Sequence, residues 1–460
     1  MSIVTTPATS RASGAMLAPH PEVTGRDIAA SDVRRPGGAW APMAWADLTR
    51  TTIEPGRYEL RVRAATDERG DAIQIPQCAG RRTVRVDSRV VSDGPGPVVV
   101  PVAPGPHEVV LEIDVSRYER RIACGESIRV GPVQPATDGL GTLRFDSPYA
   151  ARGGGQAVVY VPPGFDLRAT GQVLVGLHPW NGSIWTYAAY EELLREARAR
   201  GVVLLMPSGL GNSLYTADAE DEVLRAIDAL ASVAGEPGSF DAARAWNVSS
   251  ESGSLDAART WNVSIWGASM GGAGATTIAF HHPDLFAAAT SFFGDSKYDL
   301  STYVRSILVT ESRAHEVNAL DVVDNARNLP VWLIHGEADV TSPIRQSQML
   351  ADAMRERGYT VRFDRIADIG HSGALVARFL AEVVDAAARA RTERNPARIT
   401  YRSVRRYACV YGIYIERQDP LHDAFIDLEQ QGNSVHWLRG PEGVADLRFA
   451  PPVMRICRRP

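Results

Sequence analysis

The sequence predicts an α/β protein, with a mostly parallel sheet covered by helices on both faces and flanked by two smaller regions made of strands. Between about residues 156 and 390, short apolar strands alternate with helical segments, a pattern typical of such a sheet. The regions before and after it alternate apolar and polar residues with a period of two, which favours antiparallel strands. A chain of 460 residues is also long enough for several domains.

We therefore expect four parts. Residues 1–40 are rich in Ala, Pro, Thr, Ser and Gly and show no period, so we expect a disordered leader there. Residues 41–137 are expected to form a β-sandwich accessory domain and residues 138–392 the α/β domain. Residues 393–460 are expected to form a small C-terminal β appendage.

The accessory domain is predicted from short alternating strands at Tyr58–Arg63, Arg82–Asp87 and His107–Ile113. Turn signals at Asp93–Gly96 and Pro104–Pro106 separate such strands. The pattern resembles the jelly-roll accessory modules that accompany carbohydrate-active and esterase domains. That resemblance implies glycan binding, while a packing role without a ligand is an equally open interpretation.

The central region begins after a glycine-rich junction at Asp138–Gly155. Its strands are continuously apolar, as expected for strands buried on both faces, and its helices carry apolar residues at helical spacing. The expected strands are Gln156–Pro163, Val173–Leu177, Val202–Met206, a strand from Val263, Ala287–Phe293, Val331–Ile334 and Thr360–Phe363, and the expected helices are Tyr187–Arg200, Glu220–Val233 and Ser372–Ala390.

Residues 239–249 are nearly repeated as residues 254–264, and there is no third copy. Two copies are too few for a repeat architecture, so we interpret this 239–264 segment as a local tandem duplication. The second copy leads into the strand at Val263, and the first is expected to form an extra surface loop.

Four segments after Thr392 return to the strand pattern. A region this short buries little core by itself, so we expect it to pack on the α/β domain. The segments are Ile399–Val404, Tyr407–Ile415, Ala424–Leu428 and Ser434–Leu438.

The strongest functional motif is Gly267-x-Ser269-x-Gly271, between the strand from Val263 and a helix of small residues. A serine on a sharp strand-to-helix turn projects its hydroxyl above the sheet edge. The N–H of Met270 would then lie at a helix N-terminus, where it could bind an oxyanion. The motif alone arises easily by chance in a chain with 40 glycines, so its flanking strand and helix carry the prediction.

A nucleophilic serine needs a histidine to take its proton and a carboxylate to orient that histidine. Asp339 follows the strand Val331–Ile334, and His371 precedes the last helix, so both should lie at the carboxyl edge of the sheet with Ser269. Asp295 is a rival acid one strand earlier. We favour Asp339 because an H-G-x-x-D-x-x-x-P pattern surrounds it.

These motifs resemble the α/β-hydrolase superfamily, close to the esterase and polyhydroxybutyrate-depolymerase-like group that borders the prolyl-oligopeptidase-like family. The resemblance implies a second oxyanion donor in the loop after Val173–Leu177, which falls on Trp180. Such families usually have His-Gly where this chain has His178-Pro179, and proline has no N–H. The matching residues are Leu177–His178, Asp256–Arg259, Gly267–Gly272, His335–Asp339 and Gly370–His371.

The sequence therefore predicts a serine hydrolase that cleaves carboxylic esters of small or polymeric substrates through an acyl-enzyme. Ser269, His371 and Asp339 would be its triad, with Met270 and Trp180 as its oxyanion hole. One alternative is a serine peptidase of the prolyl-oligopeptidase-like type, whose usual propeller needs more N-terminal length than this chain has. The other is a non-catalytic glycan-binding protein on a hydrolase scaffold.

Other classes are disfavoured by composition. A net charge of −5 leaves no basic excess for nucleic acid. No metal-ligand cluster, phosphate-binding loop or dinucleotide motif is found, so we expect no cofactor and no metal. We find no signal peptide or membrane span, which suggests a cytoplasmic protein by default.

The cysteines leave the compartment open. Cys78 and Cys124 fall in the N-terminal part, and Cys409 and Cys457 fall in the C-terminal part. A disulfide in each flanking region would imply an oxidising compartment, and four unpaired thiols are an equally open interpretation.

Overall fold

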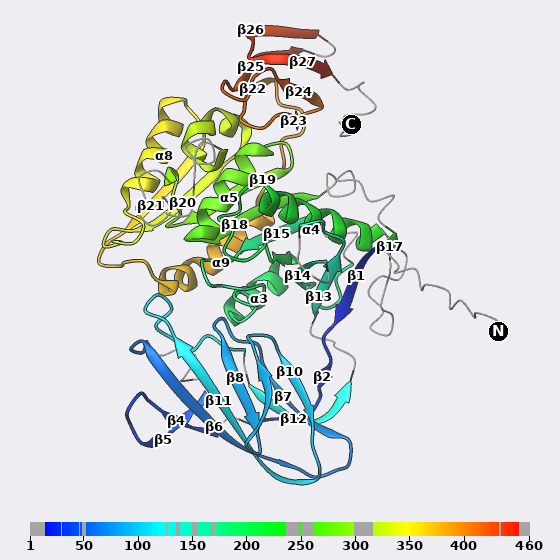
Figure 1. Ribbon diagram of the computed structural model, residues 1–460, viewed down its shortest axis with the longest axis vertical. Helices are drawn as coiled ribbons and strands as arrows, with labels where there is room; N and C mark the ends of the chain where they lie inside the picture. The colour runs from blue at the N-terminus through cyan, green and yellow to red at the C-terminus, as the bar shows by residue number, and fades with distance from the viewer. Residues whose placement is uncertain are drawn as a thin grey trace, which may run out of the picture.

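The computed structural model arranges three regions one above another, with the sandwich below, the α/β domain in the middle and the appendage above (Figure 1). It describes residues 14–28, 30–45, 47, 52–125, 127–134, 139–149, 154–166, 171–235, 248–249, 261–298, 316–431 and 434–449.

The α/β domain is built on a ten-stranded sheet of order β17-β1-β13-β14-β16-β15-β18-β19-β20-β21. Its strands from β16 to β21 run parallel, and β14, β13, β1 and β17 extend the sheet as antiparallel neighbours. The bounds are β1 (Gly14–Pro19), β13 (Leu140–Phe145), β14 (Gly155–Tyr160), β15 (Gln172–Leu177), β16 (Val203–Pro207), β17 (Val248–Ser249), β18 (Asn262–Ala268), β19 (Phe286–Phe292), β20 (Val331–Gly336) and β21 (Val361–Ile366).

Helices cover both faces of this sheet because its strands are apolar on both. In β15, Val173 and Val175 belong to one core cluster, while Leu174 between them belongs to the other. The first cluster includes α4 (Asp218–Gly235), α5 (Met270–His281), the 3₁₀ segment η3 (Ala319–Asn328) and α8 (Arg345–Glu356), and the second includes α3 (Glu191–Arg200) and α9 (Gly373–Arg389).

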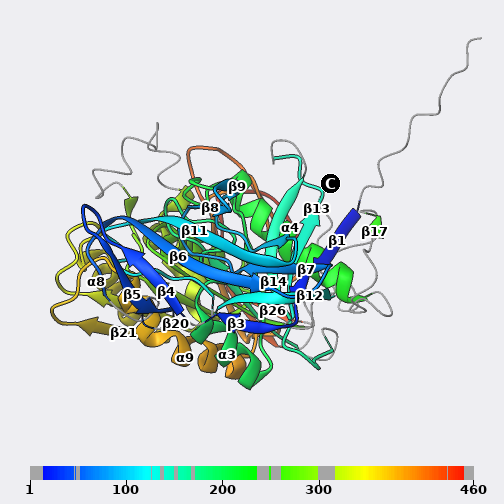
Figure 2. The same ribbon diagram turned by 90° about the horizontal axis from the view of Figure 1, so that it is seen from below.

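The N-terminal domain is a sandwich of two antiparallel sheets around its own core. Alternation is clearest in β6, where Tyr58, Leu60, Val62 and Ala64 are buried and their neighbours face outward. Seen from below, the sandwich lies in front of the α/β domain (Figure 2). One sheet holds β4 (Ala30–Arg34), β5 (Trp40–Ala44), β6 (Gly56–Thr66), β8 (Arg82–Val86), β9 (Arg89–Asp93) and β11 (Gly105–Val115), and the other holds β2 (Glu22–Val23), β3 (Arg26–Ile28), β7 (Asp71–Ile75), β10 (Val98–Pro101) and β12 (Ile128–Gln134).

Two expectations about the ends of the sandwich are corrected. The expected leader 1–40 holds strands from Gly14 onward, because β1 pairs with β13 in the central sheet and β2 to β4 join the sandwich. The expected junction Asp138–Gly155 likewise contains β13, which pairs with β14. The leader gains its strand conformation from pairing with distant residues, and β13 lies between β1 and β14 in the sheet, so composition did not reveal either strand.

Two further expectations are corrected in detail. The helix expected from Tyr187 begins only at Glu191, and turns precede it. The strand expected over Tyr407–Ile415 is a hairpin, because Tyr411 and Gly412 both have positive φ, as a two-residue turn requires. Most of the duplicated 239–264 segment lies outside the described residues.

Cys78 and Cys124 are joined by a disulfide within the sandwich, which is compatible with an oxidising compartment. Cys409 is disulfide-bonded too, and Cys457 lies outside the described residues. No helix in the described ranges is long and apolar enough to cross a membrane.

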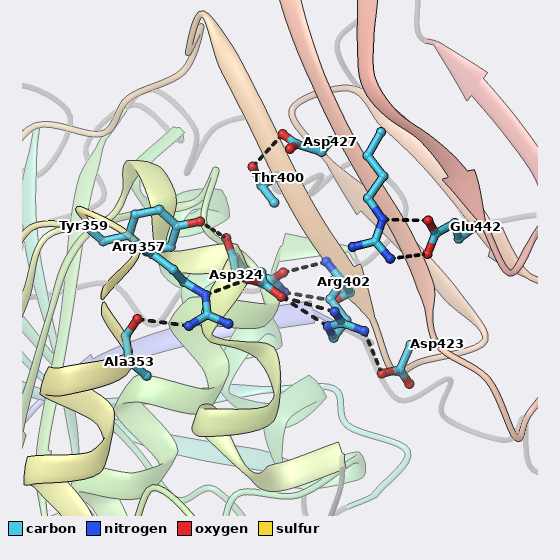
Figure 3. A network of polar contacts seen from close by, with 11 residues as sticks. Asp324, Ala353, Arg357, Tyr359, Thr400, Arg402, Asp423, Asp427 and Glu442 are labelled. Atoms are coloured by element: carbon cyan, nitrogen blue, oxygen red, sulfur yellow. Dashed lines mark hydrogen bonds and ion pairs between the residues drawn. The ribbon is translucent and has the colours of Figure 1, made fainter. Parts of the chain in front are cut away.

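The C-terminal appendage consists of two three-stranded sheets, and the first of them packs on η3 through β22. The backbone of Arg402 exchanges two hydrogen bonds with the Asn325 side chain, at 2.6 and 3.0 Å. Asp324 lies between Arg402 and Arg357 and pairs with both (Figure 3). The strands are β22 (Arg398–Ser403), β23 (Tyr407–Val410), β24 (Ile413–Arg417), β25 (Ala424–Gln431), β26 (Ser434–Glu442) and β27 (Val444–Phe449).

A buried carboxylate also ties the appendage to the α/β domain. Glu220 in α4 lies 2.8 Å from Nδ1 of His281, 2.7 Å from Nε2 of His282 and 3.5 Å from the guanidinium of Arg405. Burial alone would raise the pKa of Glu220, but Arg405 and His281 hold that pKa well below its usual range. The carboxylate is therefore ionised in the folded protein and depends on Arg405 for a compensating charge.

We expect Arg405→Met to lower the free energy of unfolding by about 3 kcal/mol, because it leaves the charge of Glu220 partly uncompensated. Urea denaturation at neutral pH measures this change. The neighbouring variant Arg406→Met is the control, since Arg406 is exposed and lies 3.7 Å from Glu416. It should change stability by less than about 0.5 kcal/mol, and equal losses in both variants would contradict the role given to Glu220.

Candidate active site

The candidate nucleophile sits on a strained turn between β18 and α5. Ser269 has φ of 56° and ψ of −120°, and α5 begins at the next residue. Its N–H donates to the carbonyl of Phe292 at 2.9 Å, which fixes the turn to β19. A Cβ on Gly271 would collide with the carbonyl oxygen of Leu177, so the helix can start here only because this residue has no side chain.

A tyrosine that the sequence did not single out holds the same turn. The hydroxyl of Tyr187 donates to the carbonyl of Leu177 and accepts from the N–H of Ala268, each at 2.9 Å. Complete burial raises its pKa, so the hydroxyl stays protonated and can donate. Tyr187 thereby links the ends of β15 and β18. The sequence predicts Tyr187 as the first residue of a helix, and no local signal marks it as a residue that holds the turn.

The structure brings the side chains of Ser269, His371 and Asp339 together. Nε2 of His371 lies 2.8 Å from Oγ of Ser269, and Nδ1 lies 2.7 Å from Oδ2 of Asp339. His371 occupies the loop before α9, whose first turn Ser372 caps by accepting from the N–H of Ala374. The Asp339 side chain is fully buried and that of His371 is 8% exposed, so solvent screens their interaction little.

Asp339 is surrounded by donors. Its Oδ1 accepts from the N–H groups of Thr341 and Ser342 at 2.8 and 2.9 Å, and its Oδ2 also lies 3.4 Å from Nε2 of the buried His335. Burial alone would raise the pKa of Asp339, but the hydrogen bonds with His335 and His371 hold that pKa well below its usual range. Asp339 is therefore ionised at neutral pH.

The rival acid Asp295 lies nearby in a different environment. It accepts a hydrogen bond of 2.5 Å from the Ser342 hydroxyl rather than from His371. Burial raises its pKa, which the Ser342 hydrogen bond and His371 only partly offset, and the charge of Asp339 raises it further. Of the two carboxylates, Asp339 is the one that contacts the imidazole.

The loop that contains Trp180, expected to supply the second oxyanion donor, is held by hydrogen bonds to Asn212. Pro179 begins a turn closed by the N–H of Gly182 at 2.9 Å. Asn181 has φ of 60°, and its N–H donates to Oδ1 of Asn212, which donates back from Nδ2, both at 2.7 Å. Trp180 is partly buried against the core. Met270 is the first residue of α5. Their roles as oxyanion donors stay predictions.

Two aromatic rings that the sequence did not indicate pack on the imidazole of His371. The Phe293 ring lies 4.5 Å from it, centroid to centroid, and comes from the residue after β19. The Tyr118 ring lies 5.4 Å from it in an edge-on arrangement and comes from the sandwich. No pattern near Tyr118 could have revealed this contact, because it depends on how two domains pack.

A hollow of about 470 Å³ lies elsewhere, between the sandwich and the α/β domain. Gln77 and Arg129 line it from one side and Tyr160, Glu191 and Arg195 from the other. None of Ser269, His371 and Asp339 lines it, so we do not assign it to the same site. Among the described residues, no group of three or more His, Cys, Asp or Glu side chains could hold a metal ion.

One family model matches part of the chain. Residues 240–385 match the sequence model of the prolyl oligopeptidase family. No curated protein sequence matches the chain.

Several solved structures match part of this chain at low identity. FphF, a fluorophosphonate-binding serine hydrolase of Staphylococcus aureus, is 15% identical over 54% of this chain and 97% of its own, with a TM-score of 0.42. An S-formylglutathione hydrolase from Agrobacterium tumefaciens is 19% identical over 55% and 96%, with a TM-score of 0.40. Dipeptidyl peptidase 4 of Porphyromonas gingivalis is 17% identical over 52% and 34%, with a TM-score of 0.38.

The central domain has the α/β-hydrolase fold, with a strand-turn-helix at Ser269 and a parallel sheet behind it. The resemblance to this superfamily is confirmed by the family match over residues 240–385. The fold and the match of residues 240–385 support a hydrolase of the serine class.

Proposed function

We propose that this protein hydrolyses carboxylic esters through a covalent acyl-enzyme on Ser269. The observation that carries the proposal is the continuous chain of short contacts from Ser269 Oγ through His371 to Asp339. A serine hydroxyl becomes nucleophilic when a neutral imidazole can take its proton and a carboxylate orients that imidazole. The positive φ of Ser269 supports this role, because such strain is characteristic of functional turns.

The reaction follows from these positions. Oγ of Ser269 attacks the ester carbonyl while Nε2 of His371 takes its proton, and Asp339 stabilises the imidazolium that forms. The tetrahedral oxyanion is bound by the N–H groups of Met270 and Trp180. The C–O bond to the alcohol then breaks, and His371 gives its proton to the departing oxygen. Water, deprotonated by His371, attacks the acyl-serine, the bond from the acyl carbon to Oγ breaks, and His371 returns the proton to Oγ as the acid leaves.

We expect a fluorophosphonate probe to label the wild-type protein covalently and Ser269→Ala not at all, because the probe reacts with an activated serine hydroxyl. Mass spectrometry of the labelled peptide locates the adduct. Thermal unfolding of both proteins should match, which shows that the variant is folded. Absence of labelling in the wild type, or equal labelling of Ser269→Ala, would favour a non-catalytic glycan-binding protein on the same scaffold.

We expect Asp339→Asn to lower kcat on p-nitrophenyl acetate by about 10⁴-fold, because the amide favours the wrong tautomer of His371. Asp295→Asn should lower it by less than about tenfold, since Asp295 bonds Ser342 instead of the imidazole. Initial rates at saturating ester measure both. The reverse order of losses would assign the acid to Asp295.

A second candidate is a serine peptidase, which the match of residues 240–385 to the prolyl oligopeptidase family favours. The same site can cleave esters and amides, so the substrate must be tested directly. We expect kcat/KM on short-chain p-nitrophenyl esters to exceed kcat/KM on proline-containing p-nitroanilide peptides. This ratio should be at least about 100-fold larger in the wild type than in Ser269→Ala, which measures the background reaction. A higher kcat/KM on the peptides would establish the peptidase.

A further inference from the structure

A segment of the sandwich, Ser116–Arg121, reaches the hydrolase domain beside His371; we call it the bridging segment. It follows β11, which ends at Val115, and the chain after it is tied back by the disulfide between Cys78 and Cys124. This end of β11 faces α9 (Figure 1). The segment is therefore anchored in its own domain on both sides.

Hydrogen bonds hold the bridging segment on the hydrolase domain. The carbonyl of Tyr118 accepts from the N–H of Gly373, at the first residue of α9, at 2.9 Å. The carboxylate of Glu119 accepts from the hydroxyl of Tyr190 at 2.9 Å. A Cβ on Gly373 would meet the Glu119 carboxylate, which shows how closely the two domains approach. The segment thus has a defined position over the start of α9.

This position puts the Tyr118 ring edge-on against the imidazole of His371, with centroids 5.4 Å apart. His371 must reach both Oγ of the serine and the oxygen of the leaving group. A leaving group that takes the proton of Nε2 therefore lies beside this imidazole. Tyr118 is the wall that the sandwich contributes beside the same imidazole.

Arg117 adds a positive charge to that wall. Its exposed guanidinium donates to the Tyr118 hydroxyl and lies over the Tyr118 ring, 4.6 Å from the centroid. The two other arginines of the bridging segment are paired, Arg120 with Glu54 at 2.6 Å and Arg121 with Glu119 at 2.8 Å. Within the part of the chain that the structure describes, no carboxylate lies within ion-pair distance of Arg117.

The distance between the Arg117 guanidinium and the His371 imidazole is one that a small substrate can span. The separations of 5.4 Å from His371 to Tyr118 and 4.6 Å from Tyr118 to Arg117 place the guanidinium no more than about 10 Å from the imidazole. The acids on the hydrolase side of the imidazole, Asp339 and Asp295, are engaged by His371 and by Ser342. Arg117 is thus a charge beside this wall that has no ion-pair partner among the described residues.

We propose that Arg117 and Tyr118 form a subsite for esters whose alcohol portion carries a carboxylate. A guanidinium binds a carboxylate through two parallel hydrogen bonds, and the Tyr118 hydroxyl pre-positions it. The sandwich is on this account a part of the active site that selects the leaving group. The inference rests on the proposed esterase function and adds its substrate class.

The test compares two acetate esters, 4-acetoxybenzoate with an anionic leaving group and methyl 4-acetoxybenzoate with a neutral one, by the release of each phenol at low ionic strength. We expect wild-type kcat/KM to favour the anionic ester, and Arg117→Gln to lower the ratio of the two values about tenfold. Arg117→Lys should restore part of the ratio, and Tyr118→Phe should lower it less than Arg117→Gln does. A ratio in Arg117→Gln equal to that of the wild type overturns the subsite.

Arg89→Gln is the matched control, because it removes an exposed arginine from the same domain. Arg89 pairs with Val86, and Val86 pairs with Val109 of β11. Val109 is six residues before Val115, after which the bridging segment begins, so Arg89 lies roughly 20 Å from that segment. Its ratio should equal that of the wild type. An equal fall in Arg89→Gln and Arg117→Gln would reflect the net charge of the domain and would overturn the subsite.

Fluorophosphonate labelling distinguishes a failure of the proposed subsite from a failure of the proposed esterase function. If the wild type labels but cleaves neither ester, the measurement becomes the slowing of labelling by 4-hydroxybenzoate. That slowing should be present in the wild type and lost in Arg117→Gln, and its absence in the wild type overturns the subsite alone. If the wild type does not label at Ser269, the proposed function and the subsite are overturned together.

Discussion

The close approach of the Gly271 backbone to the carbonyl oxygen of Leu177 is the constraint on which the candidate site depends. Because β15 and β18 are parallel neighbours, both end at the same edge of the sheet. The chain after β18 must turn back over the sheet immediately, and only residues without a Cβ leave room for it. Ser269 takes the strained conformation at the apex, and Tyr187 ties the two strand ends beneath it.

Buried carboxylates in this protein behave differently because they have different numbers of donors. Asp339 accepts from two backbone N–H groups and contacts His371, and it is ionised despite complete burial. Asp295 has the hydroxyl of Ser342 and a pKa raised by burial. Glu220 is as deeply buried as Asp339, and Arg405 with two histidines holds it. Donors and charge, rather than burial alone, set the ionisation of each group.

The sandwich bears on the chemistry because it touches the residue that would perform it. Its bridging segment meets α9, Tyr190 and the ring of His371 through two hydrogen-bonded residues, Tyr118 and Glu119. The disulfide between Cys78 and Cys124 restricts the chain just after this segment. An accessory domain that packs in this way supplies part of the surroundings of His371.

Local patterns in the sequence determined the α/β fold and the residues of the candidate site. Apolar strands alternating with helices predicted the sheet, and the motif at Ser269 with its strand and helix predicted the turn. Asp339 and His371 could be proposed because each follows its own parallel strand, and such strands bring their ends to one edge. These signals lie within a few residues of chain, where pattern and structure are linked directly.

Only the tertiary structure decided which carboxylate contacts the imidazole, how β1 joins the central sheet and which side chains surround His371. Asp339 and Asp295 have equivalent chemistry, and their distances to His371 depend on how β19 and β20 align. Tyr118 is 253 positions from His371 in the chain, and nothing near it in sequence marks the contact. Such contacts arise from the packing of separate elements and domains, which local periodicity and turn chemistry do not encode.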